Sequence, residues 1–220
     1  TPDNVVADFE AIAAAAGADR FAYYGYSWLG LAGIQLAIRS PRLTAVAVGG
    51  YPALGGPYRE MLEVTRAGHR LAVDAATKPP SDEPSPSAPD PNADWNGNPD
   101  DYDWSNVQIA LSPDQTRQFV TLYEALQSFD DRAAQGRITC PRLNFVGSRD
   151  NIDYGAGWGD VRVGIAEAVI ANRAELERFG WFVDVLDGLD HTGAMQPPAV
   201  LSVLRPWLTE VLAATASARA

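Results

Sequence analysis

The clearest structural signal in this chain is FAYYGYSWLG, at residues 21–30. Aromatic side chains dominate its first part, which favours a β-strand over Phe21–Tyr26. Apolar residues then recur at helical spacing from Trp28 to Arg39, and a proline follows soon after. Ser27 is therefore predicted to lie in a tight turn between a strand and a helix, and Gly25 leaves room for the backbones to approach.

The segments on either side of this turn extend the alternation of helix and strand. A helix is predicted over residues 5–16, and the apolar run 43–48 is typical of a buried parallel strand. Further along, strands are predicted at 142–146 and 181–186, and helices at 163–179 and 198–213. We therefore expect an α/β fold with a mostly parallel sheet flanked by helices.

The middle of the chain has a different composition. Helices are predicted at 58–76 and 112–132, the second with Ser112 as N-cap. Between them, residues 79–103 are rich in proline and acidic side chains, which predicts a solvated, extended loop. We therefore divide the chain into a first core part at 1–51, an insertion at 52–136 and a second core part at 137–220.

Three polar residues follow predicted strands and form a candidate catalytic set. Ser27 follows the first strand, Asp150 follows 142–146, and His191 follows 181–186. The carboxyl ends of parallel strands meet at one edge of a sheet, so these side chains are expected to converge. A serine nucleophile needs a base to accept its proton and an acid to orient that base. The amide of Trp28, at a helix N-terminus, is a candidate oxyanion donor.

Other residues compete for these roles or flank them. His69 is the other of the chain's two histidines. It falls within a predicted helix, where a packing role is favoured. Asp190 and Asp153 are alternative orienting acids, but a sequence neighbour rarely reaches the Nδ1 of the adjacent imidazole. Tyr26 and Tyr51 flank strand ends and are candidate walls of a substrate pocket.

These features resemble the α/β-hydrolase superfamily. The resemblance rests on GYSWLG at 25–30, ITCPRLNFVGSRD at 138–150 and DGLDH at 187–191. It implies a serine hydrolase with Ser27 as nucleophile, Asp150 as orienting acid and His191 as base, with the insertion at 52–136 acting as a helical cap. It also implies cleavage of an ester or related acyl bond through an acyl-enzyme, without cofactor or metal. The alternatives are an acyltransferase, a cofactor-free oxidative enzyme, or a non-catalytic binding protein of the same fold.

The chain departs from the family pattern in two places. Leu29 stands where the family has a small residue, which predicts a slightly altered turn. The family also has several strands before the nucleophile, including the loop that supplies a second oxyanion amide. Only 26 residues precede Ser27 here. We therefore expect those strands to come from residues outside this sequence, from a second copy or from a partner segment.

Composition narrows the classes of partner. Lys and Arg total 17 and Asp and Glu total 28, which gives a formal net charge of −11. This acidic balance argues against nucleic acid and anionic membrane surfaces, and no apolar run is long enough for a transmembrane helix. A single cysteine excludes an internal disulfide. We expect a cytoplasmic enzyme that acts on a small molecule.

Overall fold

The computed structural model describes residues 1–77 and 111–217, and these residues form two compact units. The first unit comprises residues 1–57, 128–151 and 164 onward, and the second comprises residues 58–127 and 152–163. The loop predicted at 79–103 lies outside the described residues.

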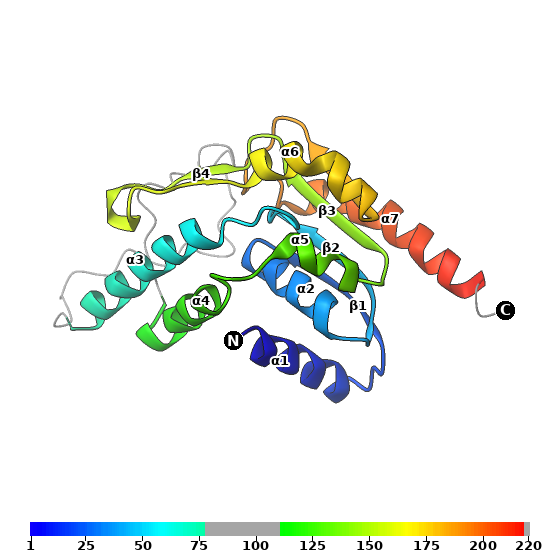
Figure 1. Cartoon of the computed structure of the whole chain (residues 1–220), viewed down its shortest axis with the longest axis horizontal. Helices are drawn as coiled ribbons and strands as arrows, with labels where there is room; N and C mark the ends of the chain where they lie inside the picture. Colours follow the sequence, from blue (N-terminus) through cyan, green and yellow to red (C-terminus); the bar gives the residue numbers. More distant parts are fainter. Residues whose placement is uncertain (78–110, 218–220) are drawn as a thin grey trace. The chain divides into compact units, whose positions relative to one another are not determined.

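The first unit is built on a four-stranded sheet in which each neighbouring pair is parallel (Figure 1). Its strands are β1 (Phe21–Tyr26), β2 (Leu43–Gly49), β3 (Arg142–Gly147) and β6 (Trp181–Leu186), in this spatial order. The central strands β2 and β3 are almost wholly buried, as expected for parallel strands that are covered on both faces. The predicted parallel α/β fold is confirmed.

Helices cover the two faces of this sheet. They are α1 (Pro2–Ala15), α2 (Trp28–Arg39), α5 (Asp131–Ala134), α6 (Ile165–Arg178) and α7 (Pro197–Ser217), with a 3-10 turn at Gln135–Arg137. On one face, α7 packs against alternate strand residues, among them Tyr26, Ala45 and Phe145. On the other face, α2 comes so close that a side chain at Gly33 would collide with Tyr23. In Figure 1, α1 and α2 lie side by side next to β1 and β2.

The second unit pairs two helices with a two-stranded sheet. The helices are α3 (Tyr58–Thr77) and α4 (Pro113–Ala125), and the strands are β4 (Asn151–Asp153) and β5 (Arg162–Gly164), linked by a 3-10 turn at Ala156–Trp158. Ser112 caps α4 and forms a capping box with Gln115, as its sequence position predicts. His69 on α3 contacts the Thr116 hydroxyl on α4, with 2.9 Å between Nδ1 and Oγ1.

Two of the predicted helices differ from the structure because another element takes up part of their range. The helix predicted at 112–132 ends at Ala125, because the chain turns after Leu126 and a new short helix begins with Asp130 as N-cap. The helix predicted from Val163 begins at Ile165, because residues 162–164 pair as β5 with the short strand β4. The insertion expected at 52–136 also differs from the second compact unit, which includes residues 152–163 and excludes 52–57 and 128–136.

One buried amide ties the loop after β2 to the sheet. Asn144, fully buried on β3, accepts a hydrogen bond from the Ala53 amide at 3.1 Å. Its Nδ2 donates to the carbonyls of Val48 and Tyr51 at 3.1 and 2.9 Å. One side chain thus forms three hydrogen bonds to the backbone at the end of β2 and in the loop that follows it.

Replacing Asn144 with leucine should therefore destabilise the protein. The change removes the side-chain partner of three buried backbone groups, and each unsatisfied group costs roughly 1–3 kcal/mol. We expect the free energy of unfolding in urea to fall by about 2–4 kcal/mol. Asn172→Leu is the matched control, because the Asn172 amide donates one hydrogen bond to Ala168 within α6. Equal losses in the two variants would contradict this role for Asn144.

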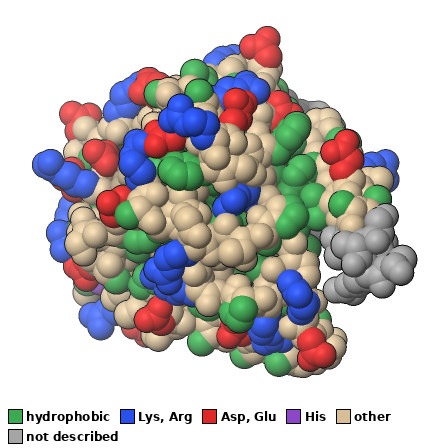
Figure 2. Space-filling view, turned by 45° about the vertical axis from the view of Figure 1, so that its right-hand side comes forward, with side chains coloured by type: hydrophobic (Ala, Val, Ile, Leu, Met, Phe, Trp, Pro, Cys, Tyr) green, Lys and Arg blue, Asp and Glu red, His purple; other side chains and the backbone are tan. Residues whose placement is uncertain are grey.

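The surface carries charges of both signs. On the face drawn in Figure 2, acidic and basic side chains are interspersed, with hydrophobic side chains between them. None of the described helices combines the length and apolar character needed to cross a membrane.

Candidate active site

Ser27 occupies a strained turn between β1 and α2. Its φ of 56° and ψ of −124° are unusual for a residue with a side chain, and its amide donates to the Gly49 carbonyl at 2.8 Å. A side chain at Gly25 would collide with the backbone carbonyl of Leu29, so only glycine permits this close approach. The Leu29 side chain itself is 46% exposed, so it does not crowd the turn as its size suggested.

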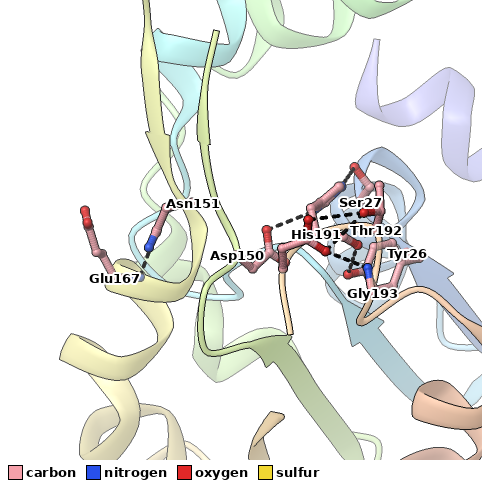
Figure 3. A network of polar contacts seen from close by, with 9 residues as sticks. Tyr26, Ser27, Asp150, Asn151, Glu167, His191, Thr192 and Gly193 are labelled. Atoms are coloured by element: carbon pink, nitrogen blue, oxygen red, sulfur yellow. Dashed lines mark hydrogen bonds and ion pairs between the residues drawn. The ribbon is translucent and has the colours of Figure 1, made fainter. Parts of the chain in front are cut away.

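Asp150 lies on the loop after β3 and is fully buried. The N-terminus of α6 holds this loop, because the Ala166 amide donates to the Asp150 carbonyl at 2.7 Å. Beside it, the Glu167 amide donates to Oδ1 of Asn151 at 3.2 Å (Figure 3). Two helix amides that lack an intrahelical acceptor thus hold the Asp150 backbone and the neighbouring Asn151 side chain.

His191 lies in the loop after β6, and its neighbour Asp190 shapes that loop. Asp190 accepts hydrogen bonds from the Gly193 amide at 2.7 Å and from the Thr192 hydroxyl at 3.0 Å. The Asp190 carboxylate therefore holds the turn around His191.

The loops after β3 and β6 are joined to each other. The Ser148 and Arg149 amides donate to the carbonyls of Leu186 and Leu189, at 2.8 and 2.9 Å. A side chain at Gly147 would collide with the Leu189 carbonyl. Gly147 and Ser148 were not among the predicted site residues, although a glycine that ends a strand is a signal of close backbone approach.

These loops bring Ser27, His191 and Asp150 into one hydrogen-bonded line (Figure 3). His191 Nδ1 lies 2.8 Å from Asp150 Oδ1, and His191 Nε2 lies 3.0 Å from Ser27 Oγ. His191 is 6% exposed, so the imidazole meets its partners in a largely water-free environment. The carboxylate fixes the tautomer with a proton on Nδ1, which leaves Nε2 to accept the serine proton.

Tyr26, the residue before Ser27, lies beneath this line. Its hydroxyl donates to the His191 carbonyl at 2.8 Å, and its ring centroid lies 5.2 Å from that of His191. Burial raises the pKa of the Tyr26 hydroxyl well above its usual value, and the negative charge of Asp150 raises it further. Tyr26 therefore stays protonated and able to donate.

The two aromatic residues expected as pocket walls are both buried. Tyr26 is 9% exposed and Tyr51 is 3% exposed. Tyr26 belongs to the hydrophobic core under α7, because the last residue of β1 faces that side of the sheet. Tyr26 therefore packs within the core, and its pocket-wall role stays a prediction, as does that of Tyr51. Trp28 is the first residue of α2, so its amide lies at a helix N-terminus beside Ser27, the place expected of an oxyanion donor.

The other candidate residues have different partners. His69 belongs to the second unit, where it contacts Thr116. Asp153 pairs with Arg162 across β4 and β5 at 2.7 Å. Among the described residues, no group of three or more His, Cys, Asp or Glu is placed to hold a metal ion.

Comparison with known proteins gives matches of structure at low sequence identity. No family model and no curated protein matches the sequence. A structure of carboxylesterases from Nitrososphaera gargenis is 16% identical with a TM-score of 0.58, over 96% of this chain and 73% of that one. A protein from Mycobacterium tuberculosis described as a non-heme bromoperoxidase is 14% identical with a TM-score of 0.56, over 96% and 75%. A bacterial membrane phospholipase A is 18% identical with a TM-score of 0.51, over 94% of this chain and 62% of its own length.

Proposed function

Since this chain has the α/β-hydrolase fold, we propose that it is a serine hydrolase that cleaves an ester or related acyl bond. The observation that carries this proposal is the hydrogen-bonded line from Ser27 through His191 to the buried Asp150. The strained backbone of Ser27 supports it further, because such strain is usually retained where it serves a function.

The proposed reaction has two steps. Ser27 Oγ attacks the acyl carbonyl while His191 Nε2 takes its proton, and Asp150 stabilises the imidazolium that forms. The Trp28 amide donates a hydrogen bond to the developing oxyanion. The C–O bond then breaks, His191 returns the proton to the leaving alcohol, and an acyl-enzyme remains. Water activated by His191 attacks this acyl-enzyme, which releases the acid and restores Ser27.

The setting of this activity is also a proposal. The substrate is a small molecule, and the proposed reaction uses no cofactor or metal. The enzyme acts in the cytoplasm, without nucleic acid or membrane. The inserted helices serve as a cap that shapes substrate access. Residues outside this sequence, a second copy or a partner segment extend the sheet beyond β1 and supply the second oxyanion donor.

A second candidate keeps the acyl-enzyme but changes what attacks it. The similarity to the bromoperoxidase-like protein favours a cofactor-free oxidative enzyme of the same fold, and an acyltransferase would use the same three residues. A comparison of water with other acyl acceptors distinguishes these candidates. Hydrolysis in buffer alone would show that water is a sufficient acyl acceptor. A non-catalytic binding protein would form no acyl-enzyme at all.

A fluorophosphonate probe tests the proposed function directly. We expect a single covalent adduct per chain, mapped to Ser27 by mass spectrometry after digestion, and hydrolysis of p-nitrophenyl acetate or butyrate. An adduct on another serine would contradict the assigned roles.

A further inference from the structure

Tyr26 precedes Ser27 in the chain, and its side chain contacts His191 in two ways. It is covalently joined to Ser27, its hydroxyl donates to the backbone of His191, and its ring packs against the His191 ring at an interplanar angle of 52°. The charge of Asp150 acts on the same hydroxyl.

The two contacts with His191 constrain different motions. The hydrogen bond to the carbonyl, 2.8 Å long and buried, fixes the backbone from which the imidazole projects. The ring contact limits rotation of the imidazole about its side-chain torsions. The Asp190 turn holds the residues that follow, Thr192 and Gly193, so Tyr26 acts on the part of the loop that Asp190 does not.

We propose that Tyr26 is a positioning residue, which holds the His191 imidazole in line between Asp150 and Ser27. This inference rests on the proposed function for its catalytic consequence, although the position of the imidazole can be measured without any substrate. The Tyr26 hydroxyl donates to a backbone carbonyl, so it takes no part in the proton transfer itself. Its effect is therefore expected on proton transfer at His191 and not on substrate binding.

Tyr26→Phe removes the hydroxyl and keeps the ring. We expect kcat for p-nitrophenyl butyrate to fall about 3- to 15-fold with KM unchanged, the range set by the loss of one buried hydrogen bond. The rate of fluorophosphonate labelling should fall by a similar factor. Tyr24→Phe is the matched control, since Tyr24 lies on the same strand, contacts Phe145 as Tyr26 does, and is 37% exposed. Equal kinetics for wild type and Tyr26→Phe would overturn the proposal, as would equal losses in the two variants.

Nitrogen-15 NMR of the imidazoles tests the same idea without substrate. The chain has two histidines, so His69 serves as an internal reference and His69→Gln assigns the signals. In the wild type, neutral His191 should carry its proton on Nδ1, as its contact with Asp150 requires. Tyr26→Phe should lower the population of this tautomer and speed exchange of the Nδ1 proton with water by about 3- to 10-fold, with the His69 signals unchanged. An unchanged His191 signal would overturn the positioning role.

The two measurements separate failure of this inference from failure of the proposed function. A wild-type protein that neither turns over nor labels would contradict the proposed function, while the NMR result would still decide whether Tyr26 holds His191. An active wild type with Tyr26→Phe kinetics and NMR signals that match it would contradict only the role of Tyr26.

Discussion

Replacing Ser27 with alanine is expected to lower kcat for p-nitrophenyl esters by at least about 10³-fold, to near the uncatalysed rate. In the proposed reaction the Ser27 hydroxyl oxygen forms the bond to the acyl carbon, and no group in alanine replaces it. The same variant should take up no fluorophosphonate. Ser202→Ala is the control, because Ser202 lies exposed on α7 and its hydroxyl donates only to the Ala199 carbonyl.

The strained backbone of Ser27 leads to a second prediction, which concerns stability as well as activity. A φ of 56° favours glycine, so Ser27→Gly should be inactive and yet more stable than wild type, by roughly 0.5–1 kcal/mol. Urea unfolding of Ser27→Gly, Ser27→Ala and wild type measures this directly. Substantial turnover by either variant, above that of buffer, would show that another residue is the nucleophile.

Asp150→Asn is also expected to have a large effect, a fall in kcat of about 10³- to 10⁴-fold. The asparagine has nearly the same shape, so the loops after β3 and β6 should keep their structure. An amide in this position stabilises the imidazolium poorly and no longer enforces a proton on Nδ1, which leaves Nε2 unable to accept from Ser27. Steady-state kinetics and fluorophosphonate labelling rates measure both consequences.

Asp190→Asn is the matched control for this substitution. Asp190 is the direct neighbour of His191, but its Oδ1 accepts from Gly193 and Thr192, and an asparagine oxygen can accept the same two hydrogen bonds. We expect less than about a threefold change in kcat, since one neutral acceptor replaces a charged one in a turn. A larger loss for Asp190→Asn than for Asp150→Asn would exchange the roles of the two carboxylates.

Much of the first unit follows from local sequence pattern. Apolar runs and aromatic enrichment identified β1, β2, β3 and β6 to within a residue or two. The central strands β2 and β3 are buried on both faces, which leaves a continuous hydrophobic signal. The short pair β4 and β5 was missed. Each strand has three residues, and the pairing depends on a partner nine or more positions away, which no local window reports.

The sequence by itself placed Ser27, Asp150 and His191 after strands, and parallel topology then required those strand ends to share one edge. Only the tertiary structure decided which carboxylate contacts His191. Asp190 is closer in sequence, but the turn it caps uses its oxygens, while the amides of α6 hold Asp150 in place. Only the tertiary structure placed the Tyr26 hydroxyl on His191, 165 residues away in the chain. Such a contact depends on how a strand and a loop that are distant in the sequence pack together. The residue order within either segment does not encode it.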